Sequence, residues 1–258
     1  MAVGTRSVHD FCWINMLSPE PARAKDFFAT VLGWSFGEIP GMGYSIKVDG
    51  KDIGGLFDAK NRDGSPHAPI IGVMVKVESA DATGEKVKSL GGTAQPSFDV
   101  GPQGRMTVCH DPAGANLDMW QPKASAGMDA DPTAHGAPSW FECMTTDMDT
   151  NAKFYSDLLG WQRELMPGSP MRYMTFKHKG APVAGMMEIT PDMQGQQPVW
   201  GTYFTVKDCD ETVKLATSVG AVMCVPAMDI AGVGRFAGLT SPQGVVFYVI
   251  TYNPQTRG

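Results

Sequence analysis

The sequence has little charge, no basic cluster and no long apolar run. Charged residues make up 19% of the 258 residues, and the Lys and Arg residues are scattered through a chain whose net charge is −6. This composition argues against a nucleic-acid partner. No window approaches the length of a membrane span, and the opening residues MAVGTRSVHDF lack the apolar core of a signal peptide. We therefore expect a cytoplasmic protein with neither a nucleic-acid nor a membrane partner.

Cysteine and histidine are also scarce. The five cysteines show no C-x-x-C spacing, which argues against a zinc knot or a disulfide framework and favours small buried side chains in a reducing compartment. No two of the five histidines share H-x-H or H-x-x-x-H spacing. A non-haem iron centre needs two histidines and a carboxylate, so the histidines do not favour a dioxygenase.

What the chain does have is a long internal repeat. The stretch FCWINMLSPEPARAKDFFATVLGW, residues 11–34, returns as SWFECMTTDMDTNAKFYSDLLGW, residues 139–161. A nearly constant offset over half the chain indicates tandem duplication of a whole domain. The matched positions include Trp13 with Trp140, Gly72 with Gly201 and Pro112 with Pro242, at offsets of 127, 129 and 130.

The repeat predicts two domains, residues 1–121 and 138–258. Residues 122–137 between them are rich in Pro, Ala and small polar residues and have no hydrophobic period, which is typical of a linker. Each domain divides again into two units of one strand, one helix and two or three strands. The predicted units span about 8–57, 69–121, 138–190 and 199–252.

The first unit shows how these elements are recognised. Residues 11–17 are a nearly continuous apolar run, which suits a strand covered on both faces. Ser18 followed by Pro19 predicts a helix that begins there, with Ser18 as the N-cap. Gly33 predicts the end of that helix.

The pattern W-x-x-x-x-x-x-[DE] followed by F-[FY]-x-x-x-L-G-W resembles the first module of the vicinal oxygen chelate superfamily. The turns at residues 111–114 (DPAG) and 241–244 (SPQG) resemble its last hairpin. The superfamily includes glyoxalase I, bleomycin resistance proteins and extradiol dioxygenases. The resemblance covers about residues 8–121 and 137–252, and the chain is also similar to two-domain actinobacterial glyoxalase-like or hydroxylase-like proteins. It implies an α+β fold, in which four βαβββ modules form two tandem domains with curved, half-open mixed sheets and outer helices.

Metal-dependent members of that superfamily carry His, Gln or Glu at three strand positions that face the cleft. In this chain the first of these positions is a tryptophan and the second a glycine in both copies. An indole has only an N–H donor and a glycine has no side chain, so neither residue can ligate a cation. Only Asp118 is a competent ligand, and one carboxylate does not make a stable site. We therefore predict no metal and no other cofactor. The corresponding residues are Trp13, Gly72 and Asp118 in the first copy, and Trp140, Gly201 and Tyr248 in the second.

Alternation along the strands predicts what lines the clefts instead. Carboxylates beside indoles should have raised pKa values, which suits proton transfer. The two tryptophans at the strand starts either form ligand walls or fill the clefts, and the two arginines either bind an anionic group or form salt bridges at the rim. The predicted ligand-binding residues are Trp13, Asn15, Trp120, Trp140, Tyr203, Tyr248, Arg105 and Arg235, and the predicted catalytic residues are Glu142 and Asp118.

These features favour a metal-free protein, monomeric or homodimeric, that takes a small aromatic or oxygenated metabolite into an apolar cleft. It either sequesters this ligand or transforms it by acid–base chemistry, and an enzyme would be a lyase, an isomerase or hydroxylase-like. One alternative is a divalent-metal-dependent glyoxalase-like lyase or isomerase, or a dioxygenase. Another is a non-enzymatic interaction protein whose clefts are filled.

Overall fold

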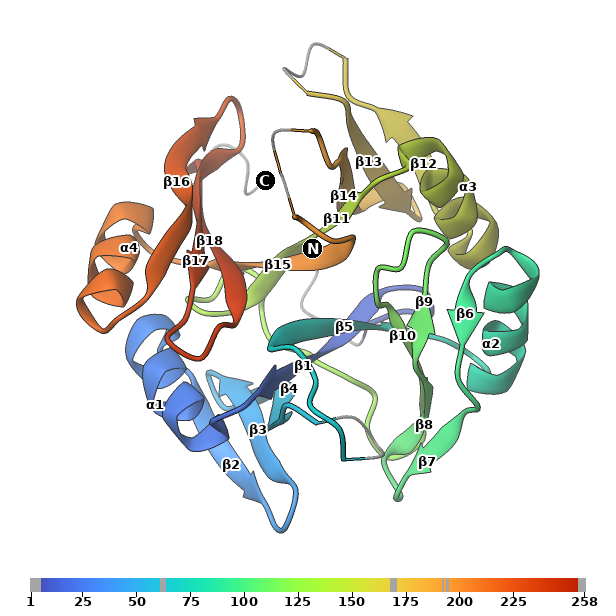
Figure 1. Ribbon diagram of the computed structural model, residues 1–258, viewed down its shortest axis with the longest axis horizontal. Coiled ribbons are helices and arrows are strands. Elements are labelled where there is room, and N and C mark those ends of the chain that lie inside the picture. The colour runs from blue at the N-terminus through green and yellow to red at the C-terminus, as the bar shows by residue number, and fades with distance from the viewer. Residues whose placement is uncertain (1–5, 61–63, 168–170, 192, 194, 255–258) are drawn as a thin grey trace.

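The computed structural model describes residues 6–60, 64–167, 171–191, 193 and 195–254. Two eight-stranded mixed sheets, one from each half of the chain, carry four helices on their outer faces (Figure 1). The predicted α+β fold class, with two tandem domains built around curved sheets, is confirmed.

The first sheet has the strand order β2-β3-β4-β1-β5-β10-β8-β7. Its central strands β1 and β5 are antiparallel, and each has a parallel neighbour on its other side, β4 and β10. Two helices, α1 (Pro21–Leu32) and α2 (Ala80–Ser89), cover the outer face. The strands are β1 (Phe11–Ser18), β2 (Ser35–Ile39), β3 (Gly43–Val48), β4 (Lys51–Asp58), β5 (Ile70–Lys76), β7 (Phe98–Val100), β8 (Gly104–Thr107) and β10 (Asp118–Pro122), with β6 (Thr93–Ala94) and β9 (Cys109–His110) in a small separate sheet.

The second sheet repeats this plan in the order β12-β13-β14-β11-β15-β18-β17-β16. The central strands β11 and β15 are again antiparallel, with β14 and β18 as their parallel neighbours. Helices α3 (Met148–Leu159) and α4 (Cys209–Ser218) lie outside. The strands are β11 (Pro138–Thr145), β12 (Gln162–Leu165), β13 (Tyr173–His178), β14 (Ala181–Glu188), β15 (Val199–Thr205), β16 (Val222–Ile230), β17 (Gly234–Thr240) and β18 (Val246–Tyr252).

The start of α1 differs from the prediction. Strand β1 continues to Ser18, whose hydroxyl accepts the N–H of Glu20 at 3.2 Å, and Glu20 itself occupies the N-cap without a side-chain cap. Pro21, and not Pro19, therefore fills the first helical position, where its missing N–H costs nothing. Gly33 ends the helix in the left-handed conformation (φ 68°), as predicted.

One hydrophobic core joins the two halves. The ring of Phe11 stacks on that of Phe141 with 4.0 Å between centroids, and Trp34 meets Phe204 at 5.1 Å. In Figure 1, α1 lies beside α4 and α2 beside α3, so the helices of one half pack against those of the other. The two copies therefore act as a fused pair and share their buried surface.

A polar network crosses the same interface. Asp111, in the DPAG turn of the first half, is buried, and its Oδ2 accepts the hydroxyl of Tyr155 on α3 at 2.7 Å. The Tyr155 oxygen in turn accepts the indole N–H of Trp200 at 2.9 Å. Asp111 Oδ1 accepts three N–H groups of its own turn. Every polar group of this network thus finds a partner, as burial requires.

The segment at residues 122–137 packs against the domains and is not a loose tether. Met128 is buried, and its N–H donates to the carbonyl of Cys12 at 2.6 Å. The carbonyl of Gly136 accepts the indole N–H of Trp34 at 2.8 Å. Sheet strands end at Pro122 and resume at Pro138, while the exact domain limits 1–121 and 138–258 stay a prediction.

The helices are short. Across the described residues the longest have 12 residues, and none is long and apolar enough to cross a membrane. The monomeric or homodimeric state stays a prediction.

Candidate active site

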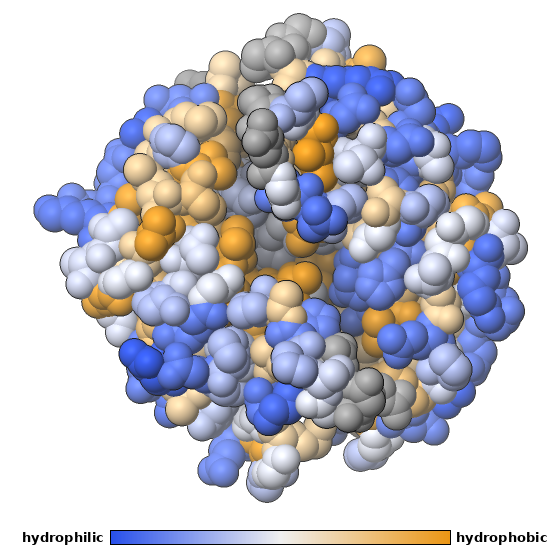
Figure 2. Space-filling model, viewed as in Figure 1, coloured by the Kyte–Doolittle hydropathy of each residue, from blue (hydrophilic) through white to orange (hydrophobic). Residues whose placement is uncertain are grey.

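The inner face of each sheet is the face that the helices do not cover. Phe141 and Cys143 of β11 belong to the large core that contains the helix side chains, whereas Trp140, Glu142 and Met144 face a separate cluster without any helix residue. Figure 2 shows this side of the molecule hollowed near its centre, with apolar side chains at the edge of the hollow. The alternation of β11 therefore presents one carboxylate to a concave apolar surface.

Glu142 lies at the centre of the second inner face and is only 7% exposed. Its Oε1 accepts the hydroxyl of Tyr203 at 2.8 Å, and its Oε2 accepts the hydroxyl of Tyr173 at 2.8 Å. Trp140 donates its indole N–H to the Tyr173 oxygen at 3.2 Å. The two carboxylate oxygens are thus held in a fixed orientation by two tyrosines, one of which is itself oriented by Trp140.

Two glycines make room for this arrangement. Gly185 on β14 and Gly201 on β15 are the in-register neighbours of Glu142 on either side. A Cβ on Gly185 would lie 1.9 Å from the Tyr173 oxygen, and one on Gly201 would lie 2.8 Å from the ring of Tyr248. The absence of side chains at these positions lets tyrosines from the next strands lie across the sheet beside the carboxylate.

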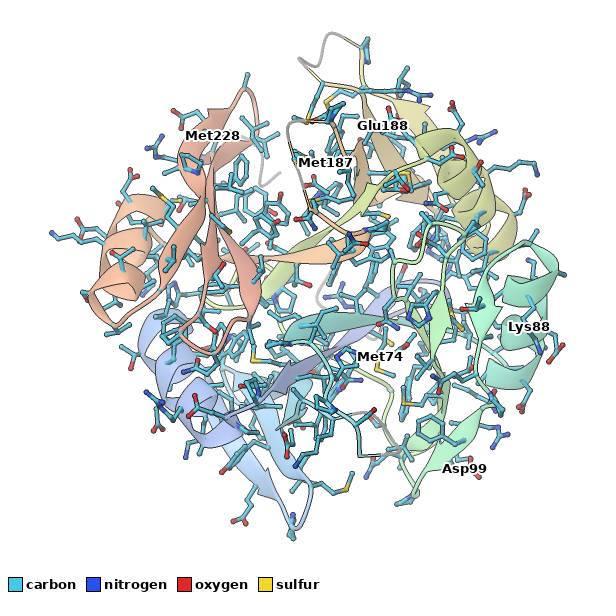
Figure 3. The ribbon with its side chains drawn as sticks, in the orientation of Figure 1. Met74, Lys88, Asp99, Met187, Glu188 and Met228 are labelled. Carbon is cyan, nitrogen blue, oxygen red and sulfur yellow. The ribbon has the colours of Figure 1, made fainter. Side chains whose placement is uncertain are left out.

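Aromatic and methionine side chains complete the wall around Glu142. The rings of Tyr203 and Tyr248 stack with centroids 4.6 Å apart, and Phe236 lies 5.8 Å from Tyr203. Figure 3 shows Met187 inside this half of the molecule. The cluster contains Met144, Met187, Tyr203, Tyr248 and Ile250, with Trp140, Tyr173, Ile189, Met193, Val199, Val225, Val233, Phe236 and Tyr252 packed against it.

The electrostatics of the site follow from its burial. Removal from water raises the pKa of Glu142 above its ordinary value, and the hydroxyls of Tyr173 and Tyr203 offset part of that rise. Burial also raises the pKa of both tyrosines, so they remain protonated donors at neutral pH. A buried carboxyl group with a raised pKa and fixed partners is suited to accept and return a proton.

The first inner face holds the other predicted catalytic residue, Asp118, which is 6% exposed. Its Oδ1 accepts the amide of Asn116 at 2.9 Å and the N–H of Cys109 at 3.4 Å. Burial raises the pKa of Asp118 to about 7, and these two donors oppose the rise. Asp118 is therefore a carboxyl group that titrates near neutrality.

The neighbours of Asp118 are packed more tightly into core. The indole of Trp120 is buried and donates to the carbonyl of Ser125 at 3.0 Å, and Asn15 donates to the sulfur of Met74 at 3.4 Å. Trp13 packs against the same small cluster. The hydrogen-bond donors of Trp120 and Asn15 thus find acceptors around the first face itself, whereas two tyrosine hydroxyls of the second face donate to Glu142.

The two arginines predicted to bind the ligand do not line the clefts, and each forms the ion pair that was the alternative to binding an anionic group. Arg105 forms two hydrogen bonds to Asp81 of α2 at 2.9 and 3.0 Å. Arg235 bonds Asp210 of α4 at the same two distances. Both guanidinium groups lie on the helix side of their sheets, because their strand parity turns them away from the inner face. The ion pair recurs in each copy, and the matched spacing from Asp81 to Arg105 and from Asp210 to Arg235 could have revealed it.

A groove of about 350 Å³ lies on the outer surface beside α2, lined by residues that include Asp81, Lys88 and Arg105. Figure 3 shows Lys88 at the outer rim, far from Met74 and Met187. The charged groups that line the groove are already paired, Arg105 with Asp81 and Lys88 with Glu85. We therefore place the candidate site on the inner faces.

Sequence reasoning missed Tyr173, which lies on β13 and not on a strand that carries a family motif. Phe236 and Tyr252 were also missed. The signal that could have found Tyr173 is the pair Gly185 and Gly201, since a glycine inside a strand marks a close approach by another group.

Solved structures with this fold were found by comparison of coordinates. A Mn(II)-bound glyoxalase from Novosphingobium aromaticivorans has a TM-score of 0.65 at 16% identity, covering 95% of this chain and 82% of that one. A 2,2',3-trihydroxybiphenyl 1,2-dioxygenase from Sphingomonas wittichii strain RW1 has a TM-score of 0.67 at 11% identity, covering 95% and 91%. These likenesses establish the shared fold.

The Mn(II)-bound glyoxalase corrects the expectation that no divalent metal is involved, because it shows divalent metal use in this fold. Within the described ranges no group of three or more His, Cys, Asp and Glu side chains could hold a metal ion. Both oxygens of Glu142 accept tyrosine hydroxyls, and Asp118 stands without a second ligand. The described side chains therefore do not fit a metal.

Sequence comparison gives the family. The protein named "Putative glyoxylase CFP32" of Mycobacterium tuberculosis is 32% identical over 252 residues, which cover 94% of this chain and 95% of that protein. The anthracycline biosynthesis protein DnrV of Streptomyces peucetius is 32% identical over 130 residues, 45% of this chain and 47% of DnrV. The sequence model of the family matches residues 138–248. The chain belongs to the Glyoxalase/Bleomycin resistance protein/Dioxygenase superfamily.

Proposed function

We propose that the inner face of the second half binds a small aromatic or oxygenated metabolite and that Glu142 exchanges a proton with it. The observation that carries this proposal is a buried carboxylate with both oxygens held by tyrosine hydroxyls inside an aromatic wall. A purely structural core rarely contains such a group, because burying a carboxylate is costly. Active sites, in contrast, are where burial and oriented partners shift a pKa in this way.

The wall supports an aromatic ligand. Tyr203 and Tyr248 are already stacked, and Trp140 and Phe236 add further ring surface around the carboxylate. Flat rings bind well between such side chains through offset stacking and edge contacts. The names of two relatives point the same way, since an anthracycline and a trihydroxybiphenyl are both oxygen-bearing aromatic molecules.

The chemistry assigned to Glu142 is general acid–base catalysis. The carboxylate accepts a proton from a hydroxyl or an activated carbon of the ligand, and the resulting carboxylic acid returns it to a different atom. Tyr173 and Tyr203 act as positioning residues, because each fixes one carboxylate oxygen through its hydroxyl. Proton transfer of this kind contributes a rate factor of about 10²–10⁴.

Native mass spectrometry of freshly purified protein tests for a co-purifying small molecule, and turnover of the identified compound is then followed with and without added Mn(II). Glu142→Gln should leave binding of a neutral ligand within about threefold and lower turnover by about 10²–10⁴. Asp118→Asn, at the carboxylate of the other inner face, is the matched control and should keep turnover within about twofold. Normal turnover by Glu142→Gln would remove Glu142 from the mechanism, and binding without turnover by the native protein would identify a sequestering protein.

A further inference from the structure

Among the described residues, no cationic side chain acts on Glu142 or on the tyrosines around it. The titratable groups that influence Glu142, Tyr173, Tyr203 and Tyr248 are these four residues themselves, Tyr252 and Cys224, without a lysine, an arginine or a histidine. Glu142 is the one carboxyl group in this set. Its carboxylate therefore has no described counter-charge beside it.

Two arginines adjacent in sequence to residues of this face, Arg172 and Arg235, are already paired with carboxylates. Arg172 precedes Tyr173 in the chain, but its guanidinium bonds Asp149 of α3 and lies 3.8 Å from Glu188. Arg235 bonds Asp210 of α4. Neither guanidinium is available to neutralise a ligand that lies beside Glu142.

The hydrogen-bonding groups beside Glu142 are also one-sided. Tyr173 and Tyr203 donate their hydroxyl hydrogens to Glu142, and Trp140 donates its indole N–H to the oxygen of Tyr173. A tyrosine oxygen still has a lone pair for an incoming donor, and a carboxylate oxygen accepts more than one hydrogen bond. The groups bonded to Glu142 therefore offer acceptors to a ligand and already donate their own hydrogens, while the hydroxyl of Tyr248 lies 4.0 Å from the sulfur of Met144.

Building on the proposed function, we infer that this site takes aromatic ligands that are neutral or cationic hydrogen-bond donors, such as phenols and arylalkyl amines, and rejects aromatic anions. An ammonium or phenol group can donate to Glu142 or to a tyrosine oxygen, and an ammonium also gains from the faces of the surrounding rings. A carboxylate ligand would lose its water next to another carboxylate, with no cation among the described residues beside Glu142 to replace that water.

Three probes on one ring system test this inference: 2-naphthylmethylamine, 2-naphthol and 2-naphthoate. Isothermal titration calorimetry of each with the native full chain at pH 7 and moderate salt gives the Kd directly. We expect the amine and the naphthol to bind, and the naphthoate to bind at least about tenfold more weakly than the amine, because it finds no counter-charge.

A matched pair of variants locates the effect. Glu142→Gln keeps the shape of the side chain and removes its charge, and should reduce the preference for the amine over the naphthoate by at least about tenfold. Glu188→Gln removes a half-buried carboxylate at the end of β14, which is not part of the cluster, and should leave the preference unchanged. The native protein already gives the preference itself, so the test does not depend on either variant folding.

Each outcome has one meaning. Tighter or equal binding of the naphthoate would overturn the inferred ligand class and leave the proposed aromatic site standing. A preference that survives in Glu142→Gln would also overturn it, since the carboxylate would not be its source. Failure of all three probes to bind at millimolar concentration would overturn both this inference and the proposed function.

Discussion

The two inner faces use one scaffold for two different side-chain sets. Asn15 in the first half and Glu142 in the second stand at equivalent places on β1 and β11, and each has a glycine in register on both neighbouring strands. Around Glu142 the surrounding positions carry tyrosines, whereas around Asn15 they do not. The equivalent pairs, first half before second, are Asn15 and Glu142, Gly43 and Tyr173, Met74 and Tyr203, and Asp118 and Tyr248.

The two halves thus kept the same strand pairing after duplication, while their inner faces acquired different side chains. In the first half, Trp120 is bonded to the chain that follows its strand, and Asp118 is held by Asn116, so the face closes on itself. In the second half, a carboxylate stands at the centre of an aromatic wall. Fold alone therefore does not decide which half binds a ligand; the side chains on the inner strands do.

The largest expected difference concerns Asp118. Burial raises its pKa from 3.8 to about 7 in the folded chain, so its contribution to stability is fully present below pH 4 and is lost as pH rises to 7. Asp118→Asn removes this dependence. The free energy of unfolding of the variant, minus that of the native protein, should increase by up to about 4 kcal/mol between pH 4 and pH 7.

Urea denaturation at pH 4, 5.5 and 7 measures this change, and groups common to both proteins cancel in the difference. A flat difference across that window would show that Asp118 titrates as it does in the unfolded chain.

The next largest effect is expected at the glycines that lie in register with Glu142 and Asn15. Gly185→Ala places a Cβ 1.9 Å from the Tyr173 oxygen and should cost about 2 kcal/mol of stability, because the tyrosine must leave Glu142. Gly72→Ala, beside Asn15, places a Cβ 3.3 Å from the Asn116 amide oxygen and should cost less. Urea denaturation of both variants measures the comparison, and equal costs would contradict it.

A smaller effect is expected at the interface. Tyr155→Phe leaves the Trp200 N–H and one oxygen of Asp111 without their partner, and should lower the free energy of unfolding by about 1–2 kcal/mol. The equivalent residue of the first half is Phe28, which packs on Trp34 without a carboxylate. Thermal denaturation of Tyr155→Phe tests this value, and an unchanged melting temperature would show that water replaces the hydroxyl.

The smallest effects are expected from the outer ion pairs. Arg105→Gln and Arg235→Gln each remove a solvent-screened ion pair with a helix carboxylate, and such a pair contributes little to stability. Since both arginines lie on the helix side, the Kd of 2-naphthol should stay within about twofold in either variant. A tenfold weaker Kd in Arg235→Gln alone would place that side chain back in the second site.

Much of the fold could be predicted from the sequence because the duplicated helix and its closing Gly33 leave little freedom. The alternation of β11 also places Glu142 beside Trp140 correctly on the inner face. What could not be predicted depends on register between strands distant in sequence. Tyr173 reaches Glu142 across Gly185, and Arg235 turns to the helix side, and neither relation is visible without the pairing of the strands.

The segment at residues 122–137 has a consequence for how such sites diversify. In an assembly of two identical chains, every substitution appears twice, so a carboxylate gained by one cavity is imposed on the other. Here a continuous backbone, anchored at Cys12 through Met128, joins the two copies covalently. Each copy is thus free to change on its own, and an acid can enter one cavity while an amide remains in its twin.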